Sequence, residues 1–333
     1  MKIPLLTLLG ALVIGVGINF GTDAFIQLTL IYILINMILA MSLNLVNGFT
    51  GQFSLGHAGF MAVGAYSSGF LSTLIPPAEG PLQILYFLIY AGCGGLAAAI
   101  AGFLVGLPSL RLRGDYLAIV TLGFGEIIRV ILLNTPSVGG ARGMYGIKGP
   151  ADWTLGEFTF SKFLFGYAHA IFWVIVCFIV IWRLMRSAHG RAFLSVREDE
   201  IAAEAMGINT TSAKVRAFVL SSFFAGIAGS IFAHYSNYLN PASFSFNRSV
   251  DAVIMVVLGG MGSLSGSLMA AAIITALPEL LRPLQQMTGV DLRMVIYSLC
   301  LILLMILRPK GLMGNKELPS PWGWLKKKGA QHE

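Results

Sequence analysis

AFIQLTLIYILINMILAMSLNLV, the stretch from Ala24 to Val46, decides the fold class of this chain. It contains no Asp, Glu, Lys or Arg, and its apolar residues follow one another without the alternation expected of a barrel strand. About 20 such residues in a helix cross the roughly 30 Å hydrocarbon core of a bilayer. The stretch therefore predicts a transmembrane helix.

Comparable apolar runs recur along the chain, which is 56% hydrophobic and only 11% charged, against about 25% charged residues in soluble domains. We therefore predict an all-α integral membrane protein of about ten spans. The eighth run is too short to cross a bilayer alone, so it must extend through Gly259–Gly262 or belong to a broken helix. The predicted spans are Leu5–Phe20, Ala24–Val46, Phe53–Ile75, Leu82–Leu107, Asp115–Leu133, Gly166–Met185, Lys214–Tyr235, Arg248–Leu258, Leu264–Leu281 and Leu292–Leu307.

The distribution of Lys and Arg predicts the orientation. With the N-terminus inside, the inner loops and ends hold fifteen of the 22 basic residues and the outer loops hold six, among them Arg248. Both termini are thus expected in the cytoplasm, and the first run, which lacks a tidy cleavage site, is expected to be retained as a helix. Residues 1–315 form one predicted transmembrane domain, with a cytoplasmic segment at 187–213 and a long outer loop at 134–165. A basic cytoplasmic tail, 316–333, follows.

The cytoplasmic segment contains a polar stretch, GRAFLSVREDEIAAEAMGIN, from Gly190 to Asn209. Ser195 and Glu198, three residues apart, match a capping box and predict a helix start. Good helix formers follow as far as Met206, and Gly207 stands where a helix-ending glycine belongs. We predict one short, water-exposed helix here.

Two inner turns are rich in glycine: NGFTGQFSLGHAG (Asn47–Gly59) and GGMGSLSG (Gly259–Gly266). They are either simple hairpin turns or breaks in helices that line a pathway. Small residues four apart, such as Gly64 and Ser68 or Ala225 and Gly229, predict closely packed helices.

Polar residues are few within the spans, so each is informative. Glu126 and Arg129 lie three apart on one predicted helix face and can pair, either as a buried structural ion pair or as groups that shape a pathway. His57, near Ser54, is more often a hydrogen-bonded packing group than a ligand. The candidates for a translocation path are Ser54, His57, Tyr66, Thr121, Glu126, Arg129, Gly260 and Ser263.

No motif for catalysis or nucleotide binding occurs in the sequence. The patterns GxxxxGK[ST], GxGxxG and HExxH are all missing, and the five histidines and three cysteines show no metal-ligand spacing. We therefore predict no catalytic residues, no metal site and no enzyme activity, and any ATP must be bound by another chain. The main alternative function is an ion-coupled secondary transporter or a channel, in which Glu126 and Arg129 could couple ions. That alternative does not explain the cytoplasmic helix. A membrane enzyme is a weaker third.

Four blocks carry a family resemblance: NLVNGFTGQFSLGHAGFMAVGAYSSG (Asn44–Gly69), GDYLAIVTLGFGEIIRVILLN (Gly114–Asn134), Gly190–Asn209, and VVLGGMGSLSGSLMAAA (Val256–Ala272). They resemble the M-type permease subunit of high-affinity branched-chain amino acid ABC transporters. Urea and short-chain amide permeases share much of this pattern.

The resemblance implies the other subunits of a transporter complex. The fold would be that of the larger, type II-like ABC importers, in the bacterial inner membrane. A second, H-type permease and two cytoplasmic ABC ATPase subunits would join this chain, with ATP and Mg on the ATPases and no cofactor on this chain. A periplasmic amino-acid-binding protein would deliver leucine, isoleucine or valine. In the outer loop, the sequence VGGARG (Val138–Gly143) departs from the polar residue that relatives tend to carry before the paired glycines.

The resemblance also places the coupling segment. Glu204, Ala205 and Gly207 fall where the family carries its EAA-like element. Either Glu200 and Glu204 contact the ATPase, or Val196 and Met206 seat the helix while the acids stay solvated. A passive linker is the plain alternative. The coupling candidates are Ser195, Arg197, Glu198, Glu200, Glu204, Ala205, Met206 and Gly207.

Overall fold

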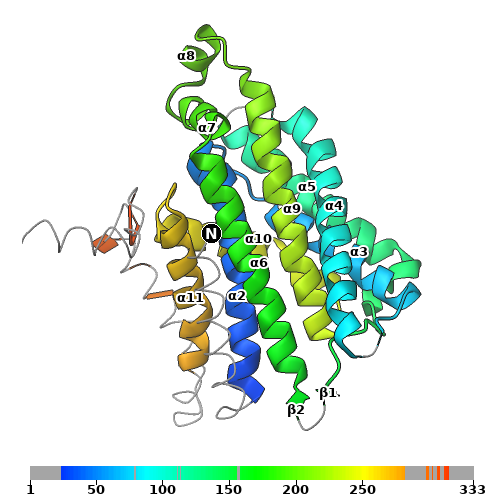
Figure 1. Cartoon of the computed structure of the whole chain (residues 1–333). Coiled ribbons are helices and arrows are strands. Elements are labelled where there is room, and N and C mark those ends of the chain that lie inside the picture. The colour runs from blue at the N-terminus through cyan, green and yellow to red at the C-terminus, as the bar shows by residue number, and fades with distance from the viewer. Residues whose placement is uncertain are drawn as a thin grey trace, which may run out of the picture.

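Helix α9 (Thr210–Ser236) forms the centre of the bundle, and most of its residues are buried. In the computed structural model it packs against α2, α3, α4 and α6, which come from distant parts of the sequence (Figure 1). The structure describes residues 24–78, 80–110, 112, 114–155, 158–281, 298–299, 302, 306–307 and 311–314. The first predicted span lies outside these residues, and the tenth is described only at isolated positions.

The described elements are helical apart from one short hairpin. Strands β1 and β2 pair antiparallel in the outer loop, with Trp153 opposite Phe160. In chain order the elements are α2 (Ala24–Asn44), the π-helix η1 (Leu45–Phe49), α3 (His57–Leu74), η2 (Gly80–Leu82), α4 (Gln83–Ser109), α5 (Asp115–Asn134), η3 (Pro136–Val138), η4 (Gly140–Arg142), β1 (Trp153–Leu155), β2 (Phe158–Phe160), α6 (Lys162–Met185), α7 (Ala188–Glu198), α8 (Glu200–Ala205), α9 (Thr210–Ser236), η5 (Pro241–Phe244), α10 (Phe246–Gly259) and α11 (Leu264–Leu280).

Glycine lets the central helices touch along their backbones. A Cβ on Gly64 of α3 would lie 2.3 Å from the Cα atom of Gly226 on α9. A Cβ on Gly229 would lie 2.0 Å from the carbonyl oxygen of Met61. The predicted close packing at Gly64 and at Gly229 is thus confirmed, and it is the backbone separation that requires glycine there.

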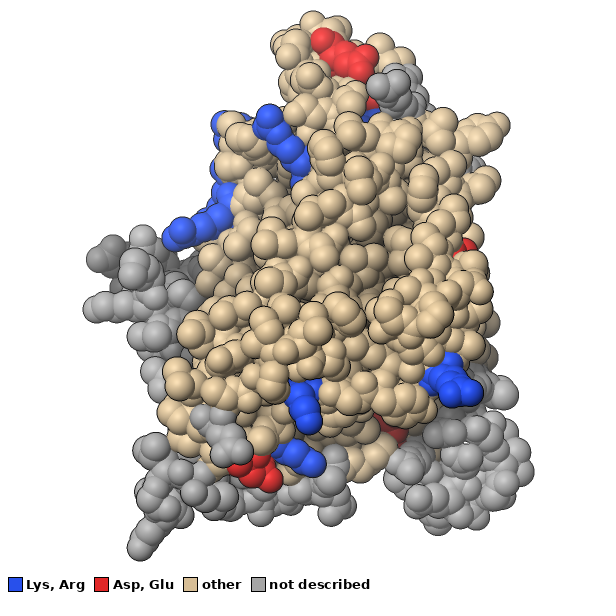
Figure 2. Space-filling view, turned by 90° about the vertical axis from the view of Figure 1, so that its right-hand side faces the viewer, with Lys and Arg blue, Asp and Glu red and all other residues tan. Residues whose placement is uncertain are grey.

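Six described segments are long and apolar enough to cross a membrane: 25–49, 80–109, 116–134, 162–185, 210–236 and 241–259. The long axes of α2, α4, α6 and α9 run alongside one another, with α7 and α8 at one end and the β-hairpin at the other (Figure 1). On the face in Figure 2, acidic and basic side chains gather towards the two ends and leave a broad, nearly uncharged band between them. This distribution is the one a bilayer requires.

The eighth predicted span lies within α10, which together with η5 before it makes up the segment 241–259. Helix α10 ends at Gly259, and α11 begins at Leu264 after a turn in which Gly260 and Gly262 have φ values of 107° and 90°. The alternative extension through Gly259–Gly262 is therefore wrong, because those backbone angles end the helix.

Arg248, which the orientation count assigns to the outer side, is held between helices. Its Nη2 donates a hydrogen bond of 2.9 Å to Oδ1 of Asn36, which lies within α2. The Nδ2 of Asn36 in turn donates to Oγ1 of Thr275 on α11 at 2.8 Å. The first-turn arginine of α10 thus bonds to α2, and through Asn36 it is linked to α11.

Candidate coupling segment and translocation path

The polar stretch forms two helices, α7 and α8, between α6 and α9 at one end of the molecule (Figure 1). Ser187 caps α7, where its Oγ accepts from the amide of Gly190 at 3.5 Å. A Cβ on Gly190 would lie 2.4 Å from the Cα atom of Met185, so glycine permits the tight turn out of α6. The whole segment is therefore anchored directly on the membrane part.

The predicted helix start at Ser195 is wrong. Ser195 lies in the last turn of α7, and its Oγ donates to the carbonyl oxygen of Ala192 at 2.9 Å. The helix is interrupted at Asp199, whose Oδ1 accepts from the amides of Ile201 and Ala202 at 2.9 and 3.0 Å. This carboxylate caps α8, and the helix break at Asp199 divides the one expected helix into two.

The predicted helix end at Gly207 is confirmed. Gly207 has φ = 81°, and its amide donates to the carbonyl oxygen of Glu204 at 2.9 Å. The amide of Ile208 donates to the carbonyl oxygen of Ala203 at 3.0 Å, which completes a Schellman motif. A left-handed residue is needed at this point, and glycine adopts that conformation without strain.

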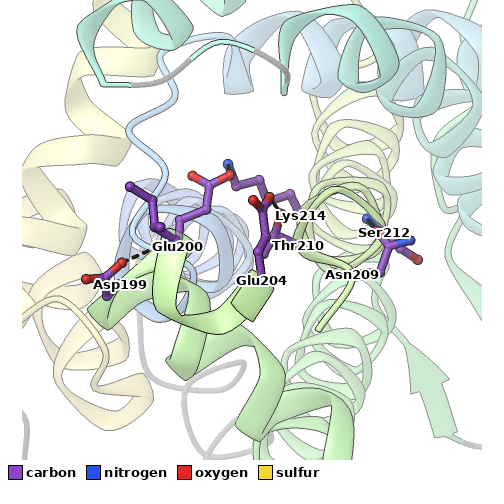
Figure 3. Close-up of polar contacts among 8 residues, drawn as sticks. Asp199, Glu200, Glu204, Asn209, Thr210, Ser212 and Lys214 are labelled. Carbon is purple, nitrogen blue, oxygen red and sulfur yellow. Dashed lines mark hydrogen bonds and ion pairs between the residues drawn. The ribbon is translucent and has the colours of Figure 1, made fainter. Parts of the chain in front are cut away.

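The two acids of α8 point back to α9 (Figure 3). Oε1 of Glu200 lies 2.6 Å from Nζ of Lys214, whose side chain is 7% exposed. Oε1 of Glu204 accepts from Oγ1 of Thr210 at 2.7 Å. These contacts tie α8 to the first turns of α9.

Apolar residues cover the outward face of α8. Ile201 is 67% exposed and Met206 is 82% exposed, and Ala202 and Ala205 are exposed between them. We call these four residues the α8 tip. On α7, by contrast, Val196 is buried and seats the helix. One alternative from the sequence had Val196 and Met206 seating the helix together. In the structure only Val196 is buried, whereas Met206 is exposed.

The remaining coupling candidates lie on α7. Glu198 is exposed, and its Oε1 lies 3.9 Å from Nε of Arg197. Arg197 itself turns towards the membrane part, where its Nη1 donates to the carbonyl oxygen of Gly48 at 2.9 Å. No pattern in the sequence indicated that Arg197 would reach back across the fold.

Three path candidates meet around the connection from α2 to α3. The amide of Ser54 donates to Oδ1 of Asn47 at 3.2 Å, and Nε2 of His57 lies 2.8 Å from Oγ of Ser42. Oγ1 of Thr121 on α5 accepts from the amide of Leu55 at 3.1 Å. All three candidates are buried and hydrogen-bonded, as a satisfied structural group would be.

Glu126 lies at a shallow pocket where three elements converge. The amino-terminal ends of α3 and α10 meet the middle of α5 there, and Oγ of Ser249 accepts from the amide of Ala58 at 3.0 Å. Nε of Arg129 lies 2.7 Å from Oε2 of Glu126, which confirms the predicted pair. We call this site the path pocket; it is lined by Leu55, Ala58, Gly59, Leu122, Gly125, Glu126, Phe244, Ser245, Phe246 and Ser249.

The last three path candidates lie apart from the path pocket. The hydroxyl of Tyr66 donates to the carbonyl oxygen of Leu239 at 3.5 Å, beyond the end of α9. Gly260 and Ser263 form the turn between α10 and α11, where Oγ of Ser263 caps α11 by accepting from the amide of Gly266. Sequence reasoning missed Ser249 at the pocket, although the shortness of the eighth apolar run could have pointed to an interior helix start.

Comparison with known proteins gives a family and close relatives. The family described as branched-chain amino acid transport system / permease component matches residues 25–307. The high-affinity branched-chain amino acid transport system permease protein LivM of Salmonella typhimurium is 39% identical, over 92% of this chain and 74% of that protein. The Escherichia coli protein of the same description has the same identity and coverage. A probable branched-chain amino acid transport permease protein LivM of Methanocaldococcus jannaschii is 24% identical, over 89% of this chain and 95% of that protein.

Proposed function

This chain belongs to the family of branched-chain amino acid transport permease components, and from that membership we propose how it works within an ATP-binding cassette importer. It is a multi-pass permease subunit of the bacterial inner membrane, and its substrates are leucine, isoleucine and valine. The observation that carries the mechanism is the α8 tip, an apolar face on an otherwise polar segment at one end of the bundle. Residues of this kind are the usual core of a protein interface.

In the proposed mechanism the α8 tip docks on a cytoplasmic ABC ATPase subunit, two of which bind ATP and Mg. Closure of the ATPase pair displaces α8. Its links through Glu200 to Lys214 and through Glu204 to Thr210 then carry the displacement to α9. The two states must differ in contacts with the ATPases for ATP to shift the population, and the α8 tip supplies that difference.

The exposed surface of α5 suits contact with a second permease subunit, which would lie beside this chain in the membrane. It exposes a row of large apolar residues, including Ile119, Ile127 and Ile131, and the pair Glu126–Arg129 is about one third exposed on the same helix. A charged residue facing lipid near the middle of a span costs about 2.5–3.5 kcal/mol on insertion scales. An H-type permease packed against α5 would remove both charges from lipid and would close the path pocket between the two subunits.

The outer loop supports a periplasmic amino-acid-binding protein as the source of substrate. It is held in place by the backbone pairing of Met144 with Leu239 and by two hydrogen bonds of 3.3 Å between Gln83 and Ala151. The exposed Tyr145 ring lies 4.6 Å from that of Tyr238, and the hydrogen bond between their side chains raises the pKa of Tyr145. A rigid, aromatic outer surface suits a docking partner.

Reconstitution of the complete complex in liposomes tests this function. We expect labelled leucine to enter only when the binding protein and ATP are both present, and labelled urea to remain outside. Uptake of urea in preference to leucine would assign the chain to the amide branch. Uptake driven by an ion gradient without ATP would contradict the importer mechanism itself.

The pair in α5 gives a first prediction. Arg129→Ala should lower leucine uptake by about 10- to 100-fold, because the carboxylate of Glu126 loses its partner inside the membrane part. The neutral double variant Glu126→Gln/Arg129→Gln leaves no uncompensated charge. If the pair is only structural, the double variant should restore both assembly and uptake. If the pair shapes the path, assembly should return while uptake stays low.

A further inference from the structure

Arg197 connects the cytoplasmic segment to both glycine-rich turns at once. Its Nη1 donates to the carbonyl oxygen of Gly48 in η1 at 2.9 Å. A Cβ built on Gly262, in the turn between α10 and α11, would lie 2.8 Å from that same Nη1. A Cβ on Gly51 would lie 3.1 Å from its Cγ. One side chain therefore fills the space between two segments that lie far apart in the sequence.

The two turns are themselves locked together under this side chain. Oδ1 of Asn44, at the end of α2, accepts from the amide of Gly262 at 2.9 Å. Its Nδ2 donates to the carbonyl oxygen of Ser263 at 2.9 Å and to Oγ of Ser267 at 2.8 Å. A Cβ on Gly48 would collide with both Asn44 and Gly262. A movement of either turn therefore moves the other.

Each turn leads by a short stretch of chain to the path pocket. From Gly51 the chain runs without regular secondary structure to Leu55, which lines the pocket together with Ala58 in the first turn of α3. From Gly260 the chain runs back along α10, a continuous helix whose other end carries Phe246 and Ser249 at the same pocket. The pocket ends of α3 and α10 thus depend on where the two turns are held.

We propose that Arg197 is a positioning residue for transport: it couples the α7–α8 segment to the paired turns at Gly48–Gly51 and Gly260–Ser263, and through them sets the ends of α3 and α10 that form the path pocket. The proposal rests on the proposed function, because it assumes that the ATPases move α7 and α8. A guanidinium suits the role, since it stays charged and offers several donors in one plane to backbone carbonyls.

The test compares Arg197→Ala and Arg197→Lys with Arg191→Ala, which removes an exposed arginine from the same helix. All are measured in the complete complex in liposomes, as leucine imported per ATP hydrolysed. Arg197→Ala should keep ATP hydrolysis but lower this ratio about tenfold or more, because a charge-assisted hydrogen bond is lost at the junction. Lysine keeps the charge but has fewer donors, so the ratio for Arg197→Lys should lie between that of Arg197→Ala and that of the unaltered chain. A ratio for both Arg197 variants equal to that of Arg191→Ala would overturn the proposal.

A second readout separates positioning from simple damage to the fold. Phe246, which is 42% exposed, is replaced by cysteine in a chain without native cysteines, and its maleimide labelling is followed with and without ATP. With Arg197 present, ATP should change the labelling rate. In Arg197→Ala the rate should no longer respond to ATP, whereas a merely loosened fold would label faster in both states and still respond.

The outcomes also distinguish this proposal from the function on which it rests. Failure of the unaltered complex to import leucine would refute the proposed substrate, while the response of labelling to ATP still reports on Arg197. If Arg197→Ala does not assemble, Arg197→Lys decides: an ATP response equal to that of the unaltered chain overturns the proposal, and a reduced response supports it.

Discussion

Replacing Met206 by glutamate is expected to abolish stable association with the ATPase subunits. Met206 is 82% exposed at the α8 tip, so the isolated chain should tolerate the change without loss of stability. In the docked state, the variant loses the burial of a methionine, about 1.5–3 kcal/mol, and places an unpaired charge in an apolar contact. Because about 1.4 kcal/mol is tenfold in affinity, we expect binding to weaken at least about 100-fold.

Co-purification and titration of the ATPase against the permease in detergent measure this effect. His189→Glu is the matched control, since it adds the same charge to an exposed position on the neighbouring helix α7, away from the α8 tip. Equal weakening by the two variants would point to net charge in place of an apolar docking face. Undiminished binding of the Met206→Glu variant would show that α8 does not dock.

The second large effect is expected at the crossing of α3, α4 and α9. In Gly64→Leu the new Cβ would lie 2.3 Å from backbone atoms of Gly226, which cannot rotate away as a side chain could. The helices must separate, and the cost should reach about 3 kcal/mol or more, at the upper end of overpacking effects. We expect most of the protein to be lost from the monodisperse fraction after detergent extraction.

Gly92→Leu is the control for this crossing. Gly92 lies on α4, and a Cβ built there meets nothing within 4 Å. The variant adds the same side chain to the same bundle without a backbone collision, so its yield and thermal stability should match those of the unaltered chain. If both variants behave alike, backbone contact at Gly64 is not what holds the three helices together.

Sequence signals predicted the local structure correctly where it depended on an interaction between residues only a few positions apart. Gly207 ended its helix as predicted, because a left-handed residue favours glycine wherever it occurs. Glu126 and Arg129 paired as predicted, since residues three apart on a helix necessarily neighbour one another. The capping box failed at Ser195 because that residue lies inside a helix that Ser187 already caps, while the carboxylate of Asp199 caps the next helix.

Directions of side chains could not be predicted in the same way. Glu200 and Glu204 looked like candidates for a partner, yet both turn inward to α9. A change such as Glu204→Arg therefore tests the link between α8 and α9 before it tests docking. The exposed face belongs to Ile201 and Met206, which a reading by polarity alone would have placed inside.

The apolar runs alone were enough to predict a helical membrane protein, and the four blocks indicated the permease family. Apolar runs, glycine positions and charge spacing act over a few residues, so they can be read along the chain. The contact of Arg248 with Asn36, and that of Arg197 with Gly48, a partner 149 residues away, were visible only in the folded chain. Those contacts depend on how the helices pack against one another, and packing between distant segments is specified by the shapes of many side chains together and by no single motif.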